Sequence, residues 1–146
     1  MLLVATGGAL GTVAFGPLSE WLGRRGAFLV FHLTGLAAAL VLFRALAGVA
    51  AIALFLPVFG FLTLGMHGGY AVYFPELFPT RLRSTGAGFC FNVGRFMAAP
   101  VLSLSGWLQA TAGLTLPNAA SLLSLLFLVG AGMLAFAPET KGKQLE

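Results

Sequence analysis

Charged side chains are scarce in this chain. Lys, Arg, Asp and Glu make up 8% of its 146 residues, whereas a soluble globular domain carries about 25%. Cysteine is scarcer still, because Cys90 stands alone and no disulfide framework can form. The chain also lacks the basic N-terminal region of a secretory signal peptide, so we expect no cleaved signal. These shortages exclude an ordinary soluble domain and a disulfide-stabilised scaffold.

The residue patterns that carry catalysis are also missing. There is no cluster of metal-ligand residues, no nucleophile beside a base and no glycine-rich phosphate loop. We therefore expect no enzyme, no metal and no cofactor. The isoelectric point near 10.0 would suit a nucleic-acid-binding protein. The basic residues do not share one solvated face, however, so no nucleic-acid partner is expected.

Apolar residues, by contrast, are abundant and come in long runs. They make up 59% of the chain, and the mean hydropathy is +0.98. About 20 apolar residues cross a bilayer as a helix. Divided at the charged residues and at the break "TAGLTLPN", the uncharged runs predict five spans, at about residues 2–19, 26–43, 48–74, 84–110 and 116–137. The expected fold is an all-α, multi-pass protein of the plasma membrane, which is the inner membrane in a bacterium.

The positions of the basic residues predict how the chain is oriented. With five spans, the loops alternate between the two sides of the membrane, and basic residues concentrate on the cytoplasmic side. One side would hold six of them, and the other would hold Arg44 alone; the six are Arg24, Arg25, Arg81, Arg83, Lys141 and Lys143. We therefore expect the C-terminus to be cytoplasmic and Met1 to face outside.

Three short segments hold ten of the twelve formal charges. They read "SEWLGRR", "PELFPTRLR" and "PETKGKQLE", and each opens with a glutamate that two basic residues follow. Glu20, Glu76 and Glu139 fall at C-terminal ends of predicted helices, where the macrodipole disfavours an anion by about 0.3–1 kcal/mol. This favours partners on other helices, either arginines of neighbouring loops or the N-terminus of the span that begins near Ser84. The alternative is incidental, solvated charges.

The same segments resemble the motifs of a known family. "GPLSEWLGRR" looks like the cytoplasmic loop motif of the major facilitator superfamily, and the other two segments complete a set that resembles the C-terminal half of its sugar porter family. The resemblance implies a secondary transporter with alternating access. It places this chain at helices eight to twelve of twelve, with the N-terminal half and the seventh helix outside it.

The resemblance also implies a cytoplasmic gate. In it, charged residues form a network that holds the outward-open state: Glu20, Arg24, Arg25, Glu76, Arg83 and Glu139. Pairs that form only while the cytoplasmic side is closed favour that state and must break for it to open. A network of this size could supply the few kcal/mol that bias a two-state gate.

Four residues inside the predicted spans are candidates for substrate binding: Arg95, Asn92, His67 and Tyr70. Arg95 lies about eleven residues into the fourth span, where an arginine costs about 2.5–3.5 kcal/mol to insert, and Asn92 shares its helix face. The guanidinium suits a carboxylate; alternatively, Arg95 is structural and bonds backbone carbonyls at a kink. His67 could bind substrate or relay protons, or be a hydrogen-bonded interior group. Tyr70 and Tyr73 could line the same cavity.

The stretch "GMHGGYAVY" before Pro75 departs from the family's hexose carriers, which usually have Gly-Pro-x-x-x-Trp there. Together with Arg95, this resembles the organic-anion branches, which carry aromatic acids, sialic acid or related metabolites. The expected substrate is therefore an organic anion or a sugar-like metabolite. No carboxylate lies inside a predicted span, so a coupling proton would be carried by the missing half or by His67. The expected partners are the bilayer, a small-molecule substrate and the missing helices or a second chain. The alternative is a truncated or accessory membrane protein without transport activity of its own.

Overall fold

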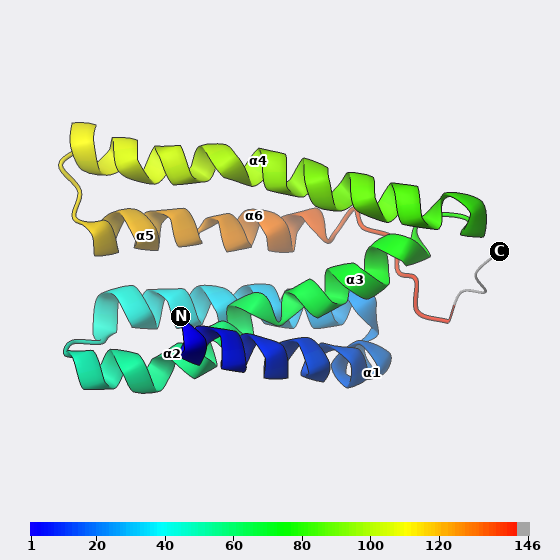
Figure 1. Cartoon of the computed structure of the whole chain (residues 1–146), viewed down its shortest axis with the longest axis horizontal. Helices are drawn as coiled ribbons and strands as arrows, with labels where there is room; N and C mark the ends of the chain where they lie inside the picture. The colour runs from blue at the N-terminus through cyan, green and yellow to red at the C-terminus, as the bar shows by residue number, and fades with distance from the viewer. Residues whose placement is uncertain (143–146) are drawn as a thin grey trace.

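The computed structural model describes residues 1–142, and this part of the chain is helical throughout, with short connections (Figure 1). Two short helices of other types, the π-helix η1 and the 3-10 helix η2, lie between the α-helices. In chain order the elements are α1 (Leu2–Leu40), η1 (Val41–Ala45), α2 (Val49–Leu64), α3 (Met66–Glu76), η2 (Thr80–Leu82), α4 (Arg83–Thr111), α5 (Leu116–Ser124) and α6 (Leu126–Met133).

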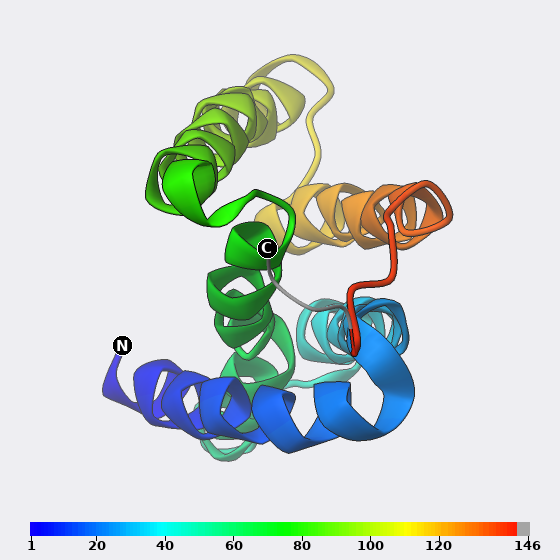
Figure 2. The same cartoon turned by 90° about the vertical axis from the view of Figure 1, so that its right-hand side faces the viewer.

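The helix α1 folds back on itself at Gly23. The backbone there has φ 82° and ψ 167°, outside the helical region, and the two arms of α1 (residues 2–22 and 24–40) run in opposite directions (Figures 1 and 2). Glycine adopts a positive φ without the steric penalty of a Cβ atom. A Cβ at this position would also come within 2.7 Å of Oε2 of Glu139. Gly23 therefore allows both the reversal and the close approach of Glu139.

Four helical segments of the described residues are long and apolar enough to cross a membrane: Leu2–Ala45, Val49–Glu76, Thr80–Thr111 and Leu116–Met133. The first includes the reversal at Gly23 and covers the first two predicted spans. The second joins α2 and α3 through Gly65, and the last joins α5 and α6 through Leu125; both linking residues keep right-handed helical dihedral angles. The sequence therefore located the long apolar helices, and the all-helical class is confirmed.

The last predicted span extends further than the helix does. It was expected to reach residue 137, but α6 ends at Met133. Beyond that point the N–H groups of residues 134–137 bond carbonyls three residues back, so the chain continues in tighter turns. Pro138 follows and cannot donate a backbone hydrogen bond.

The first arm of α1 packs closely against α2. A Cβ atom at Gly7 would overlap the carbonyl of Pro57, and one at Gly11 would overlap the carbonyl of Phe61. The spacing Gly7-x-x-x-Gly11 predicts such an approach of two helices in a membrane. Aromatic side chains fill the core beside this contact, where Phe15, Phe28 and Tyr73 are buried.

The helix α4 lies at the side of the bundle. Figure 2, which looks along the helices, shows it beside α3 and α5–α6 and away from α1. Its most apolar 18-residue window contains no buried residue; Phe96 and Leu102, for example, are 82% and 80% exposed. Exposed apolar surface on this scale marks an interaction surface, and it fits a helix that meets lipid or further helices.

Candidate functional site

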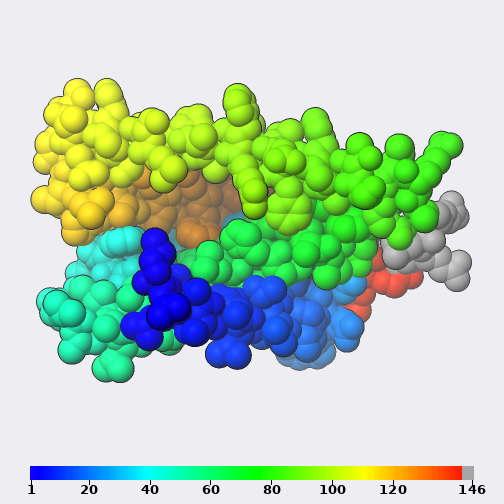
Figure 3. All heavy atoms as spheres, in the orientation of Figure 1, coloured from blue at the N-terminus to red at the C-terminus, as the bar shows by residue number. Residues whose placement is uncertain are grey.

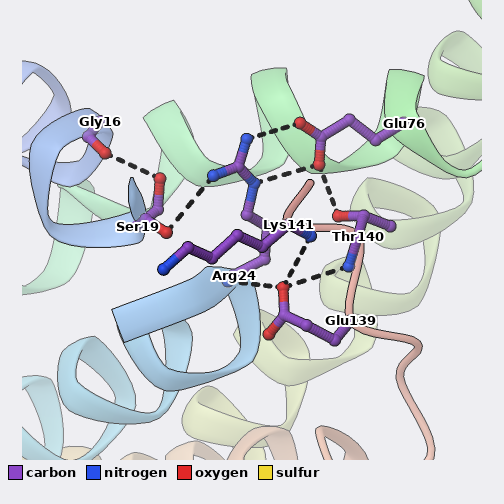
Figure 4. Close-up of polar contacts among 7 residues, drawn as sticks. All are labelled: Gly16, Ser19, Arg24, Glu76, Glu139, Thr140 and Lys141. Carbon is purple, nitrogen blue, oxygen red and sulfur yellow. Dashed lines mark hydrogen bonds and ion pairs between the residues drawn. The ribbon is translucent and has the colours of Figure 1, made fainter. Parts of the chain in front are cut away.

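The three charged segments meet at one end of the molecule, which we call the charged end. It comprises the turn at Gly23, the connection from α3 to α4 and residues 138–142, which lie together at one end of the bundle (Figure 1). Arg24 links the first two. Its Nη2 atom lies 2.7 Å from Oε1 of Glu76, its Nε atom donates to Oε2 at 3.1 Å, and its Nη1 atom donates to the carbonyl of Ser19 at 3.3 Å (Figure 4).

The pairing of Arg24 with Glu76 is bidentate and sheltered. The two side chains are 16% and 13% exposed. Bidentate arginine–carboxylate pairs fix the geometry and are stronger than neutral hydrogen bonds. Glu76 is the last residue of α3, so the pair ties the start of the second arm of α1 to the end of α3. A loop arginine as partner of Glu76 was one of the two alternatives derived from the sequence.

Glu139 caps a helix N-terminus. Its carboxylate accepts the backbone N–H groups of Arg24 at 2.9 Å and Arg25 at 3.1 Å, which open the second arm of α1. It also accepts the N–H groups of Thr140 at 3.1 Å and Lys141 at 3.0 Å. Burial disfavours the charged form, but these four hydrogen bonds outweigh it and hold the pKa of Glu139 below its usual range.

A helix N-terminus as partner of a glutamate was expected, but on a different helix. The sequence pointed to the span that begins near Ser84, whereas Glu139 binds the arm that begins at Arg24. A carboxylate at an N-terminus is favoured by the macrodipole. The glycine before Arg24 and Arg25 was the available signal, since a positive-φ glycine can start a new helix as well as end one.

Further bonds attach the C-terminal segment to the charged end, and the sequence did not single them out. The hydroxyl of Thr140, which is buried, donates to Oε2 of Glu76 (Figure 4). Lys141 Nζ donates to the carbonyl of Trp21 at 3.1 Å. Tyr73 donates its hydroxyl to the carbonyl of Pro138 at 2.7 Å. This tyrosine is buried in the core and, unlike Tyr70, does not line the cavity that lies between α3 and α4. The segment after α6 therefore contacts α1 and α3 together.

The other predicted members of the charge network lie beside the group formed by Arg24, Glu76 and Glu139. Arg25 contributes its backbone N–H and donates Nη2 to the carbonyl of Ala135 at 3.4 Å. Glu20 is exposed, and within residues 1–142 it makes no hydrogen bond or ion pair. Arg83 donates to the hydroxyl of Thr80 at 3.3 Å, within its own turn. The structure thus joins Arg24, Glu76 and Glu139 directly, whereas Lys143 and Glu146 lie outside the described residues.

A cavity of about 410 Å³ lies between α3 and α4, away from the charged end. Three of the four substrate-binding candidates line it: His67 and Tyr70 from α3 and Arg95 from α4. Cys90 lines it too. The space-filling view shows the surface hollowed between α4 and the helices below it (Figure 3).

Aromatic rings form much of the cavity wall. The ring of Tyr70 stacks on Phe74 with centroids 5.2 Å apart and on Phe28 at 5.0 Å. Phe91 stands edge-on to Phe74 at 5.2 Å. Stacked and edge-to-face contacts hold such rings in defined orientations. The wall is therefore largely apolar, and His67 and Arg95 add polar groups to it.

Arg95 is exposed and unpaired in the part of the chain that the structure describes. It lies twelve residues after the first residue of α4, which corresponds to about 18 Å along the helix. It makes no hydrogen bond or ion pair with residues 1–142, so the alternative of an arginine bonded to backbone carbonyls has no counterpart here.

Asn92 and His67 both make a local contact with a backbone carbonyl, but only Asn92 lies outside the cavity lining. Asn92 donates its amide to the carbonyl of Gly88 at 2.8 Å and is not among the lining residues. Its side chain takes the carbonyl one turn back, a local bond that competes with more distant partners. His67 places Nδ1 3.0 Å from the carbonyl of Leu64. This contact fixes one ring nitrogen and leaves Nε2 for another partner.

Comparison with known proteins reveals several relatives that are named as transport proteins. The chain is 30% identical to a Haemophilus influenzae protein named for metabolite transport. The matched 135 residues cover 90% of this chain and 32% of that protein. The chain is 36% identical over 121 residues to the inner membrane metabolite transport protein YhjE of Escherichia coli, a match that covers 78% of this chain and 27% of YhjE. It is 32% identical over 135 residues to the sialic acid transporter NanX of the same species, covering 89% and 33%. The chain belongs to the major facilitator superfamily.

This membership confirms the resemblance carried by the three charged segments. The relatives are named for transport, and the four apolar helical segments agree with a multi-pass membrane protein. The chain spans between a fifth and a third of the length of the curated relatives it matches. No protein-family model matches it, and neither does any solved structure.

Proposed function

We propose that this chain is part of a secondary transporter that carries a small organic anion across the inner membrane by alternating access. The cavity between α3 and α4 forms part of the substrate site, and the network of Arg24, Glu76 and Glu139 is part of the gate. One observation supports the proposal more strongly than any other. Arg95 presents an unpaired guanidinium, within the described residues, to an aromatic-walled cavity midway along a membrane-spanning helix.

The charge of Arg95 supports an anionic substrate. An arginine in the middle of a membrane helix costs about 2.5–3.5 kcal/mol and marks a functional site by default. A carboxylate would match the guanidinium fork, and the apolar body of the substrate would lie against Tyr70 and Phe91. Two relatives fit this chemistry by name: NanX is a sialic acid transporter, and a cis,cis-muconate transport protein of Acinetobacter baylyi is 36% identical over 101 residues.

We infer five membrane crossings, two of them from the long segment that contains α1. The segment Leu2–Ala45 has 44 residues, about twice what one crossing needs, and it reverses at Gly23. We infer two crossings from it and one from each of the other three segments. The charged end then faces the cytoplasm, because it holds most of the basic residues. The remaining helices of the carrier would come from a longer protein or a second chain, and His67 would be the residue that carries a coupling proton.

Uptake by the complete protein tests the proposal. The full-length gene product containing this chain would be reconstituted in liposomes, and uptake of radiolabelled N-acetylneuraminate and cis,cis-muconate would be measured. We expect Arg95→Gln to weaken uptake about 10- to 150-fold, since a hydrogen bond to a charged group contributes about 1.5–3 kcal/mol. Arg81→Gln is the matched control, because Arg81 is an exposed arginine at the charged end.

Either of two results would refute the anion site. Arg95→Gln could transport as fast as the wild type, or both arginine variants could lose uptake equally. Absence of uptake of any organic acid by the wild-type protein would refute the transport function itself and would favour an accessory membrane protein.

A further inference from the structure

The end of the molecule opposite the charged end has a second cavity. It has a volume of about 460 Å³ and lies between η1 and α5. Its apolar lining consists of Leu40, Leu114, Leu122 and Leu125, and its polar lining includes Arg44 and Asn118. Arg44 donates Nη1 to Oδ1 of Asn118 at 2.6 Å. One part of the cavity is therefore polar and cationic, and the rest can receive a hydrocarbon chain.

Arg44 has no acidic counter-ion among the described residues. The acidic side chains of residues 1–142 are Glu20, Glu76 and Glu139, and each belongs to a segment of the charged end. Asn118 occupies one nitrogen of the Arg44 guanidinium, which leaves the other donors of the fork free. The NH₂ group of Asn118 has no acceptor in this part of the structure. An exposed cation and an amide donor thus stand side by side without an anion.

The depth of Arg44 corresponds to the level of lipid headgroups. It follows Arg24 by 20 residues, along the second arm of α1 and the η1 turn that continues it, which is about 30 Å at 1.5 Å per residue. That is the thickness of the hydrocarbon core of a bilayer. If Arg24 lies at one membrane surface, Arg44 lies at the other.

The local backbone also favours an anion here. Arg44 belongs to the π-helical turn Val41–Ala45, a conformation that occurs frequently at functional sites. The helix α5 begins at Leu116, two residues before Asn118. Pro117 has no N–H group, and the N–H of Ala119 bonds the carbonyl of Thr115. Within the described residues, the unbonded N–H groups of this first turn are therefore those of Leu116 and Asn118. Such groups and the helix dipole attract phosphate.

We propose that this second cavity binds an anionic phospholipid, with the phosphate on Arg44 and Asn118 and an acyl chain along the leucines. A headgroup with net negative charge fits better than a zwitterionic one, because no described carboxylate is present to pair with a choline or an amine. A lipid fits better than free phosphate, because most of the lining is apolar. The site is separate from the proposed substrate cavity and does not depend on transport.

Native mass spectrometry of the full-length protein tests this proposal. The protein would be incubated in detergent with phosphatidylglycerol or phosphatidylcholine, and the fraction carrying one lipid would be measured. We expect binding of phosphatidylglycerol in preference to phosphatidylcholine. Arg44→Gln should weaken it about fivefold to tenfold, whereas the matched control Arg81→Gln, at the other end, should bind like the wild type.

A second variant separates lipid binding from a structural role. Asn118→Asp keeps Arg44 and gives it an acidic partner of the same size, so the contact between η1 and α5 is strengthened while a phosphate is repelled. We expect raised or unchanged thermal stability together with loss of bound lipid. Four results would overturn the proposal: unchanged lipid binding in both variants, equal binding of the two lipids, displacement of phosphatidylglycerol by excess inorganic phosphate, or no lipid on the wild-type protein.

Discussion

The bond between Arg24 and Glu76 gives the most specific expectation about the gate. Glu76→Gln keeps the size of the side chain but removes its charge, which leaves Arg24 without its anionic partner at 2.7 Å. Both side chains are about 15% exposed, so the pair lies between an exposed one, which contributes about 0–1 kcal/mol, and a buried one, whose disruption costs about 3–5 kcal/mol. We take about 1–3 kcal/mol for the loss.

If the pair forms only while the charged end is closed, this loss shifts the two-state equilibrium toward opening about 5- to 150-fold. Cys90 provides the readout, because it lines the cavity between α3 and α4. The full-length protein, with any other cysteine replaced, would be placed in inverted membrane vesicles. The rate at which a membrane-impermeant maleimide labels Cys90 would then be compared between variants.

We expect Glu76→Gln to raise that labelling rate by a factor within this range. Arg81→Gln is the control, because it removes a charge from an exposed residue of the same end that is outside the predicted gate. Labelling of Glu76→Gln at the wild-type rate would refute the reasoning. So would an equal increase in Arg81→Gln, since it would show a general effect of charge.

Three further expectations concern stability, measured by thermal unfolding of the full-length protein. Gly23→Ala should destabilise it by about 1–3 kcal/mol, because φ 82° and ψ 167° lie in a region that essentially only glycine adopts and because the new Cβ would meet the Glu139 carboxylate. Gly16→Ala, whose Cβ would have no atom within 4 Å, should not destabilise it, and equal losses would contradict this account. Tyr73→Phe should cost about 0.5–1.5 kcal/mol through the lost bond to Pro138, and no change would show that this bond adds nothing. The pKa of Glu139 is lowered in the folded protein, so its contribution is complete above its ordinary pKa of 4.5 and is lost as pH falls through the lower folded-state value. Glu139→Gln should therefore be less stable than the wild type at neutral pH and lose that difference in acid; a difference that persists in acid would contradict the assignment.

The long helices could be predicted because the membrane demands uncharged segments of fixed length. The fourth predicted span, residues 84–110, differs from Arg83–Thr111 by one residue at each end. The end of the last span could not be placed equally well. Residues 134–137 are as apolar as the helix before them, and only their hydrogen bonds distinguish the tighter turns.

The charge network was predicted in part, for a physical reason. Unfavourable helix ends showed that the glutamates need partners, and Arg24 fulfils this for Glu76. Which partner each glutamate takes depends on how residues 138–142 fold back over Gly23, and local sequence carries no record of that contact. The roles of Glu20 and Arg83 in a gate remain predictions, since both lie at the margin of the network in this structure.

The cavity, like the charge network, could be predicted only in part. His67, Tyr70 and Arg95 were selected as polar groups inside apolar spans, and the packing of α3 on α4 brings them to one cavity. Asn92 was selected for its spacing from Arg95, but a bond to the carbonyl of Gly88 satisfies its side chain locally. Spacing along a helix shows which residues share a face, and it does not show which partner each side chain chooses.

Protection of Cys90 by substrate is the measurement that tests the central claim most directly. Cys90 and Arg95 line the same cavity, so an organic acid bound to Arg95 should shield the thiol from alkylation. The account predicts that cis,cis-muconate or N-acetylneuraminate slows labelling of Cys90 in the full-length protein and that Arg95→Gln abolishes this protection. Protection that persists in Arg95→Gln, or labelling that no organic acid slows, would contradict it.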